Sequence, residues 1–217
     1  MKDSNLRELE RLLTSARKAG GDSYAPDAVS QLVKYYGMVL KWNSRLHLTT
    51  ITEPAEFLSR HIFESSMVES LLPEQIRSVW DLGSGVGVPG IPVSIFRPDI
   101  HVHLVESNRA KSIFLDEVVY ALGLGNAEVH RARFESLDPP PFDSCVTARA
   151  VERMEKIIPK ILEFGSASSR ILIFGNADLA LVLSGANGVN GGGGRSLLTH
   201  PVPDCDNSLL VELTRST

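Results

Sequence analysis

The sequence predicts an α/β protein with a mostly parallel seven-stranded sheet, an antiparallel C-terminal hairpin and an N-terminal helical extension. Three observations predict this class. From residue 77 onward, short apolar strand-like runs alternate with helical stretches, which is typical of a parallel sheet covered on both faces. The first of these strands runs directly into a glycine-rich turn at residues 83–90. The last two strands, 197–201 and 209–213, flank a turn-rich segment, as the strands of a hairpin do.

The remaining elements follow from the spacing of apolar residues. Helical spacing predicts amphipathic helices at 6–18, 27–42 and 54–72. The other predicted strands are 78–82, 101–106, 127–131, 143–147 and 170–174, and the helices between them are 90–96, 109–122, 151–164 and 176–184. We therefore expect a helical extension at residues 1–73 and a main domain at 74–217. Four consecutive glycines at 191–194 predict a flexible loop.

The composition excludes several classes of protein. The 217 residues carry a formal net charge of −4, so a nucleic-acid partner must be held by a local basic patch and not by an overall basic field. The two cysteines, Cys145 and Cys205, lack CxxC spacing, which predicts neither a disulfide framework nor a zinc site, and we expect no bound metal. No signal peptide or membrane span is evident in the pattern, so we expect a cytoplasmic, monomeric protein.

The glycine-rich turn indicates a nucleoside-binding site. Gly85, Gly87 and Gly90 satisfy the dinucleotide-binding spacing, and Glu106 ends the next strand about 20 residues further on, where a carboxylate can reach a ribose. This spacing occurs in binders of nicotinamide dinucleotides and in other nucleoside-binding proteins. The glycine spacing by itself therefore leaves the ligand open.

Three features favour S-adenosylmethionine over a nicotinamide dinucleotide. Asp81, at the end of the first strand, can hold an ammonium group but would repel a pyrophosphate. Pro89 and Pro92 remove backbone N–H donors where a diphosphate would need them. A terminal hairpin after five α/β units also fits the sheet of methyltransferases. The sequence therefore predicts a Rossmann-like class I S-adenosylmethionine-dependent methyltransferase fold.

Seven short motifs extend this interpretation to one family. They are Lys41-Trp42-Asn43, Leu46-His47-Leu48-Thr49, Arg60-His61-Ile62 with Ser65, the run from Asp81 to Pro92, Phe114-Leu115, Arg133-Phe134-Glu135 and Arg149-Ala150. In this order they resemble the signatures of the ribosomal RNA small-subunit methyltransferase G family, also called glucose-inhibited division protein B. The resemblance implies methylation of N7 of one guanine in 16S ribosomal RNA, with S-adenosylmethionine as the methyl donor. The substrate would be 16S ribosomal RNA or a small-subunit particle.

The resemblance also implies which residues bind the donor. These are Asp81, Gly83, Gly85 and Val88 around the turn, Glu106, Ser107 and Asn108 toward the ribose and adenosine edge, and Phe134 and Glu135 beside the adenine. Parallel strands end at one edge of the sheet, where open α/β sheets bind their ligands, so the positions after the strands are consistent with this set.

Arg149 is the candidate catalytic residue, because it follows the fourth strand and emerges at the same edge. Its guanidinium could hold the guanine O6 or a phosphate oxygen, or contact the carboxylate of the donor. The alternative is a surface ion pair with Glu152 or Glu155. Guanine N7 already carries a lone pair, so methyl transfer to it requires no general base.

A set of basic residues is predicted to contact RNA, provided that they converge around the donor site. They are Lys34, Lys41, Arg45, Arg60, His61, Arg109, Lys111, Arg149, Arg153 and Lys156. If they are scattered, a solvated surface is the better interpretation. Two other functions remain open: a methyltransferase acting on a small molecule or protein, which scattered basic residues would favour, and a non-catalytic protein that binds nucleotide or RNA.

Overall fold

The protein, described here from a computed structural model, is built on a seven-stranded sheet with the strand order β3-β2-β1-β4-β5-β7-β6. The structure describes residues 2–149, 154–189, 195–203 and 208–215. β1 to β5 pair in parallel, whereas β7 runs antiparallel to both β5 and β6. The predicted sheet, with its C-terminal hairpin, is confirmed. The glycine loop at 191–194 and part of the hairpin turn lie outside the described residues.

The element bounds lie close to those predicted. The strands are β1 (Ser78–Leu82), β2 (His101–Val105), β3 (Ala127–His130), β4 (Ser144–Ala148), β5 (Arg170–Gly175), β6 (Arg195–Pro201) and β7 (Leu209–Arg215). The helices are α1 (Lys2–Ser15), α2 (Pro26–Leu46), α3 (Pro54–Phe57), η1 (Leu58–Phe63), α4 (Glu64–Ser70), α5 (Gly90–Phe96), α6 (Arg109–Leu122), η2 (Phe134–Ser136), α7 (Met154–Phe164) and α8 (Ala177–Val189).

One predicted helix differs from the expectation. The segment 54–72 was expected as a single amphipathic helix, but it consists of α3, a π-helical segment η1 and α4 in direct succession. A π-helix widens the turn, and such segments occur often at functional sites. His61 and Ile62 of η1 are both buried.

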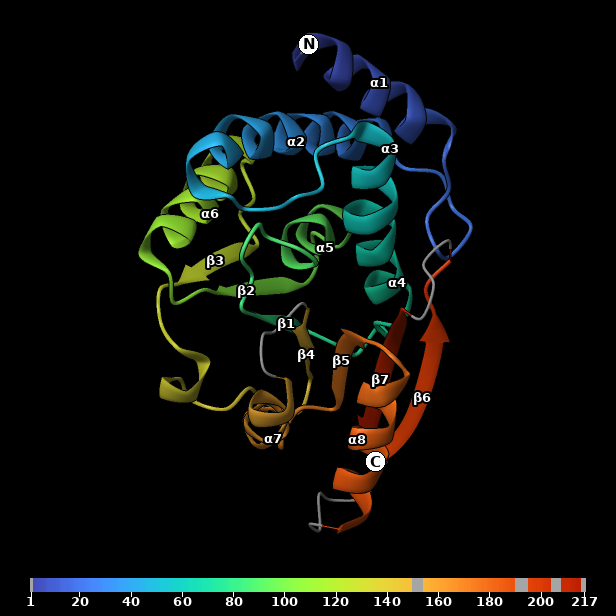
Figure 1. Cartoon of the computed structure of the whole chain (residues 1–217), viewed down its shortest axis with the longest axis vertical. Helices are drawn as coiled ribbons and strands as arrows, with labels where there is room; N and C mark the ends of the chain where they lie inside the picture. The colour runs from blue at the N-terminus through green and yellow to red at the C-terminus, as the bar shows by residue number, and fades with distance from the viewer. Residues whose placement is uncertain (1, 150–153, 190–194, 204–207, 216–217) are drawn as a thin grey trace.

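The helices cover the sheet in two layers. In Figure 1, α2, α4, α5 and α6 lie above the sheet, and α7 and α8 lie below it. Side chains alternate along β1, so Val79 faces the upper layer, whereas Leu82 belongs to the core cluster of the lower layer. None of the helices in the described ranges has the length and apolarity that a membrane crossing requires.

The N-terminal helices share the core of the main domain. Leu9 of α1 and Leu32 of α2 belong to the same cluster of buried residues as Val79 of β1 and Val102 of β2. The predicted boundary at residue 73 therefore separates the N-terminal helices from the first strand of the sheet. The two parts nevertheless bury their apolar surface in one core. This packing fixes the helices relative to the sheet.

The glycine-rich turn between β1 and α5 brings backbone and helix close together. Gly87 has a φ of 98°, and a Cβ there would lie 2.7 Å from Ile91 Cγ1. At Gly90, the first residue of α5, a Cβ would lie 2.3 Å from Leu104 Cδ2. Only glycine allows this close packing of α5 on the sheet. The turn also contains a cis peptide bond between Val88 and Pro89.

Tyr35 anchors this turn to the N-terminal helices, which leads to a first prediction. Its buried hydroxyl donates a hydrogen bond of 2.7 Å to the carbonyl oxygen of Val86. We expect Tyr35→Phe to lower the free energy of unfolding by about 1–2 kcal/mol, because the buried carbonyl loses its donor. Urea unfolding measures this change. The control is Tyr120→Phe, since Tyr120 is 90% exposed, and equal effects of the two variants would contradict the prediction.

Candidate functional site

A cleft of about 230 Å³ lies at the carboxyl edge of the sheet. Its walls come from the ends of β1 and β2, the segment after β3, and α7. The lining residues are Leu82, Gly83, Val105, Ser107, Ala132, Arg133, Phe134, Glu135, Ile157 and Ile161. The structure thus brings together four residues that the sequence predicted for donor binding, namely Gly83, Ser107, Phe134 and Glu135.

The cleft has an apolar wall, and Arg133 and Glu135 add one charge of each sign to its lining. Phe134 packs against Phe164 of α7, with ring centroids 5.6 Å apart, beside Ile157 and Ile161. Glu135 forms an exposed ion pair of 2.9 Å with Lys160, and this hydrogen bond holds the pKa of Glu135 below its usual value. The sequence did not single out Ile157 or Ile161, because apolar positions on a helix look alike whether they face a core or a cleft.

Glu106 fixes the backbone at the end of β2. Its Oε2 accepts a hydrogen bond of 2.9 Å from the N–H of Gly85, and its Oε1 accepts one of 2.7 Å from the N–H of Asn108. Each carboxylate oxygen keeps further acceptor capacity. The Asn108 side chain caps α6 by accepting from the N–H groups of Ala110 and Lys111. The carboxylate of Glu106 therefore ties the glycine turn to the start of α6.

Asp81 is buried behind the glycine turn. Its Oδ2 accepts from the N–H of Gly90 and its Oδ1 accepts from the hydroxyl of Thr147, each at 3.2 Å. Burial raises the pKa of Asp81 to about 6, although these hydrogen bonds favour the charged form. Val88 is buried in the hydrophobic core and does not line the cleft. Two predicted contacts remain predictions: that of Asp81 with an ammonium group and that of Val88 with the donor.

Arg149 makes an internal ion pair. Its Nη2 lies 3.2 Å from Oε2 of the buried Glu64, and its Nη1 donates a hydrogen bond of 2.6 Å to the carbonyl oxygen of Arg60. The guanidinium carbon lies 5.7 Å from the ring centroid of Phe174. Only 13% of the side chain is exposed. The sequence placed Arg149 at the correct edge but missed Glu64 as its partner.

Glu64 joins two arginines. Arg60 Nε lies 3.0 Å from Glu64 Oε1, on the same helical run, while Arg149 approaches from the end of β4. Burial raises the pKa of Glu64 and lowers the pKa of Arg149, so the cost of desolvation opposes the attraction between the charges. The four-residue spacing of Arg60 and Glu64 was the only signal of this cluster in the sequence.

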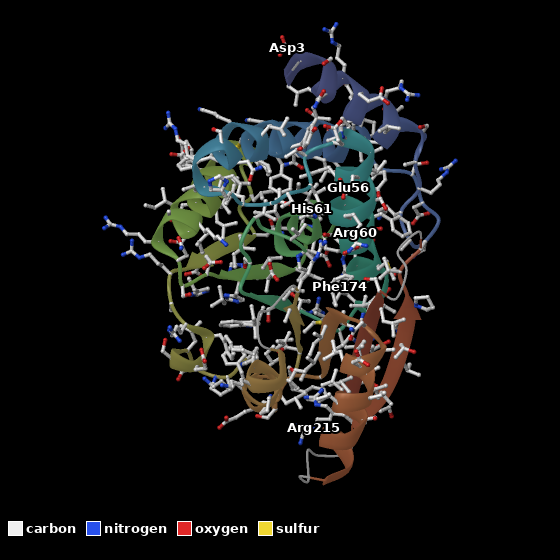
Figure 2. The ribbon with its side chains drawn as sticks, viewed as in Figure 1. Asp3, Glu56, Arg60, His61, Phe174 and Arg215 are labelled. Carbon is white, nitrogen blue, oxygen red and sulfur yellow. The ribbon has the colours of Figure 1, made fainter. Side chains whose placement is uncertain are left out.

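His61 is part of the same buried cluster and not of the surface. Figure 2 shows His61 and Arg60 on the helical run above Phe174. His61 is 3% exposed; its Nδ1 lies 3.3 Å from Arg149 Nη1, and its Nε2 lies 3.1 Å from Thr49 Oγ1. Since the guanidinium can only donate, Nδ1 accepts and Nε2 carries the proton. Burial and Arg149 lower the pKa of His61 to about 3. This corrects the expectation that His61 belongs to the RNA-contacting surface.

The predicted basic surface is partly assembled. Lys41 and Arg45 are exposed at the end of α2, and Arg109 is exposed at the start of α6 next to the half-buried Lys111. The two helix ends lie together, since Trp42 packs against Phe114 with ring centroids 5.9 Å apart. We name this group of four basic residues the α2–α6 basic rim. It flanks the carboxyl edge of the sheet, because α6 begins just after β2 ends.

The other predicted RNA contacts are placed differently. The ammonium group of Lys34 donates a hydrogen bond to the carbonyl oxygen of Ala121, near the C-terminal end of α6. Lys34 therefore lies away from the cleft. Lys156 is exposed on α7, on the opposite side of the cleft from the rim. Arg153 lies outside the described residues.

The buried cluster leads to a prediction for Glu64→Gln. The largely buried Arg149 and the partly exposed Arg60 would lose their shared counter-charge, so we expect the free energy of unfolding to fall by about 3–5 kcal/mol. Chemical denaturation measures the loss. Glu117→Gln, on the surface of α6, is the matched control. A loss no larger than that of the control would show that the ion pairs contribute nothing to stability.

Asp81 gives a pH-dependent prediction. The pKa of Asp81 is about 6 in the folded protein, against an ordinary value of 3.8. Between pH 3.8 and 6 the folded protein therefore holds a proton that the unfolded chain has lost. As the pH rises through this range, the carboxylate ionises in its buried place and the free energy of unfolding falls. Asn can accept from Gly90 and donate to Thr147 without ionising. We expect Asp81→Asn to raise the free energy of unfolding by about 1–3 kcal/mol at about pH 8 and by less at about pH 5.

Urea unfolding at the two pH values tests this expectation. The exposed Asp116 of α6 provides the control, since Asp116→Asn should change stability little at either pH. A constant destabilisation by Asp81→Asn at both pH values would contradict it.

Comparisons with known proteins agree with this geometry. Residues 28–178 match the family described as rRNA small subunit methyltransferase G. A ribosomal RNA small subunit methyltransferase G of Xanthomonas campestris pv. campestris (strain B100) is 37% identical over 147 residues, which cover 66% of this chain and 68% of that protein. One of Ectopseudomonas mendocina (strain ymp) is 35% identical over 167 residues, covering 76% of this chain and 77% of that protein.

Solved structures support the fold. A SAM dependent methyltransferase from Aquifex aeolicus superposes with a TM-score of 0.58 at 17% identity, covering 74% of this chain and 93% of that one. The predicted class I methyltransferase fold is therefore confirmed. On the family match and its relatives, the chain belongs to the rRNA small subunit methyltransferase G family.

Proposed function

We propose that this protein transfers the methyl group of S-adenosylmethionine to N7 of one guanine in 16S ribosomal RNA. One observation carries the proposal: in a chain of this family, the cleft at the carboxyl ends of β1 and β2 combines Gly83, Ser107 and Phe134. Open α/β sheets bind their ligands at this edge.

The residues of the cleft fit an adenosine with a cationic tail. Phe134, Ile157 and Ile161 offer an apolar surface for the flat base. Glu106, at the end of β2, keeps acceptor capacity for ribose hydroxyls. Asp81 and Glu106 put two carboxylates around the glycine turn, which favours a cationic sulfonium and ammonium over a pyrophosphate. This charge balance supports S-adenosylmethionine against a nicotinamide dinucleotide.

The proposed reaction needs alignment and no proton removal. Bound S-adenosylmethionine supplies an electrophilic methyl group on a cationic sulfur. Guanine N7 offers a lone pair, so no side chain of this protein has to act as a general base. The protein has to hold N7, the methyl carbon and the sulfur in line, and to keep the two substrates from moving apart.

Arg149 suits a positioning role in this scheme. Its guanidinium is engaged by Glu64, by the Arg60 carbonyl and by His61, so it ties the η1 segment to the end of β4. This favours an indirect effect on the target guanine, through the placement of the N-terminal helices beside the cleft. Direct contact of Arg149 with the base or with the donor would require these bonds to be exchanged.

The α2–α6 basic rim is the proposed RNA-binding surface. Its four cations flank the cleft and can neutralise backbone phosphates without reading the base sequence. The substrate would be 16S ribosomal RNA, free or within a small-subunit particle, bound by a monomer in the cytoplasm. The carboxylates around the glycine turn and the cations of the α2–α6 basic rim would separate the cationic donor from the anionic substrate.

The proposal is tested with the purified protein, labelled S-adenosylmethionine and 16S ribosomal RNA from cells that lack the gene. We expect one 7-methylguanosine per RNA, located by mass spectrometry. Methylation at another atom, or transfer only to small molecules or proteins, would overturn the proposed reaction. Binding of S-adenosylhomocysteine without any transfer would favour a non-catalytic binding protein.

The contribution of the basic rim is measured with Arg45→Glu. We expect KM for the RNA to rise by about tenfold, because a phosphate contact becomes a repulsion, while the affinity for S-adenosylhomocysteine stays unchanged. Arg7→Glu reverses an equally exposed charge on α1, away from the cleft. A similar rise in KM for both variants would show that only net charge matters.

A further inference from the structure

A cluster of histidines and one glutamate lies on the sheet, apart from the cleft. His101 and His103 alternate along β2, and Glu128 and His130 alternate along β3, so all four side chains leave the same face of the sheet. It is the face opposite Val102 and Leu104, which pack in the upper core. Figure 1 shows that α7 and α8 cover this lower face under β1, β4, β5 and β7, but not under β2 and β3.

The four side chains lie close together on the sheet. His103 Nδ1 lies 2.8 Å from His130 Nε2. Glu128 Oε2 lies 3.6 Å from His101 Nε2 and 3.9 Å from His130 Nε2. One ligand atom each of His101, His103 and Glu128 falls within 4.8 Å of the others. His101, His103 and Glu128 therefore face a common centre from two adjacent strands, and His130 lies beside them, next to His103 and Glu128.

These separations are those of a metal site that needs little adjustment. Zinc binds imidazole nitrogen and carboxylate oxygen at about 2.0–2.2 Å in a tetrahedron, which puts neighbouring ligand atoms about 3.4 Å apart. The observed separations of 2.8, 3.6 and 3.9 Å lie on both sides of this value. His101 and Glu128 are 44% and 58% exposed, so their side chains can rotate to close the shell without disturbing the core.

We propose that His101, His103, Glu128 and His130 form a binding site for a divalent transition metal of the zinc class. Imidazole with one carboxylate is a ligand set that suits Zn²⁺, Co²⁺, Ni²⁺ and Cu²⁺, and not Mg²⁺ or Ca²⁺. The proton shared in the His103–His130 hydrogen bond moves to the other nitrogen of its own ring, so both imidazoles stay neutral when the metal binds.

Trp80 fixes the orientation of the His103 imidazole. The two rings stack, with centroids 3.9 Å apart and planes 15° apart.

The site is distinct from the proposed methyl transfer. None of its four residues lines the cleft, and no step of the proposed reaction uses them. Its effect would be on β3, which is an outer strand of the sheet and which the metal would tie to β2. The main-chain carbonyl of His130 already accepts a hydrogen bond of 3.0 Å from the N–H of Glu106, so the metal would also steady that end of the cleft.

No metal was expected from the sequence, because neither cysteine has the spacing of a zinc site. The signal was a His-x-His pair and a Glu-x-His pair in two predicted strands. It becomes informative only when these strands are paired in the observed register, where His103 is opposite Glu128. The ordinary alternative is a solvated group of histidines that binds nothing.

The test titrates tag-free, chelator-treated protein with Co²⁺ and follows the visible absorption that tetrahedral Co²⁺ gives. We expect one Co²⁺ per chain, displaced by Zn²⁺, and a loss of affinity of at least about tenfold in His101→Ala and in Glu128→Gln. Both side chains are exposed, so these variants should fold. Zn²⁺ at about a hundred times its Kd should raise the unfolding temperature by about 5 °C or more in the unmodified protein and less in the variants.

His47→Asn is the matched control. His47 is an exposed histidine directly after α2. Its φ of 47° is a conformation that asparagine also adopts. This variant should bind Co²⁺ like the unmodified protein. The proposal is overturned if no Co²⁺ signal appears, if the signal persists unchanged in both His101→Ala and Glu128→Gln, or if His47→Asn removes it. Because the readout is metal binding, a failure of the proposed methyl transfer would leave this result unaffected.

Discussion

The carboxylate of Glu64 connects the two halves of the molecule at the cleft. It lies between the guanidinium groups of Arg60, on the helical run 54–70, and Arg149, at the end of β4. Glu64 is buried and Arg149 is largely buried, so these charges are expensive to desolvate, and removing Glu64 would leave both arginines without their shared counter-charge. The N-terminal helices can therefore shift relative to the sheet only by breaking this cluster. The position of the α2–α6 basic rim relative to the cleft depends on that constraint.

The glycine turn and the α2–α6 basic rim carry opposite charges. Asp81 and Glu106 lie around the turn, whereas the cations of α2 and α6 lie outside it. Within the proposed function, a cationic donor and an anionic RNA would each meet complementary charge only in its own place. This arrangement limits unproductive binding of RNA in the donor site.

Much of the fold could be predicted because its determinants are local. Alternating apolar runs gave the strands, and the glycine spacing gave the turn before α5. The π-helical segment could not be predicted, since its sequence has the same apolar spacing as an ordinary helix. In the candidate site, Gly83, Ser107, Phe134 and Glu135 were implied by the family resemblance, and their positions after strands agreed with it. The partner of Arg149 and the burial of His61 did not, because both depend on contacts between residues about 90 positions apart in the chain.

The two outer strands of the sheet differ from its centre in a way that bears on self-association. An unpaired strand edge offers free N–H and C=O groups to another chain, and short length, charge or proline reduces that risk. β3 spans only Ala127–His130 and carries the exposed Glu128, while β6 ends at Pro201, which has no N–H to donate. Both edge strands therefore carry features that oppose strand pairing between two copies of the protein. Such features protect the sheet from edge-to-edge aggregation through its backbone.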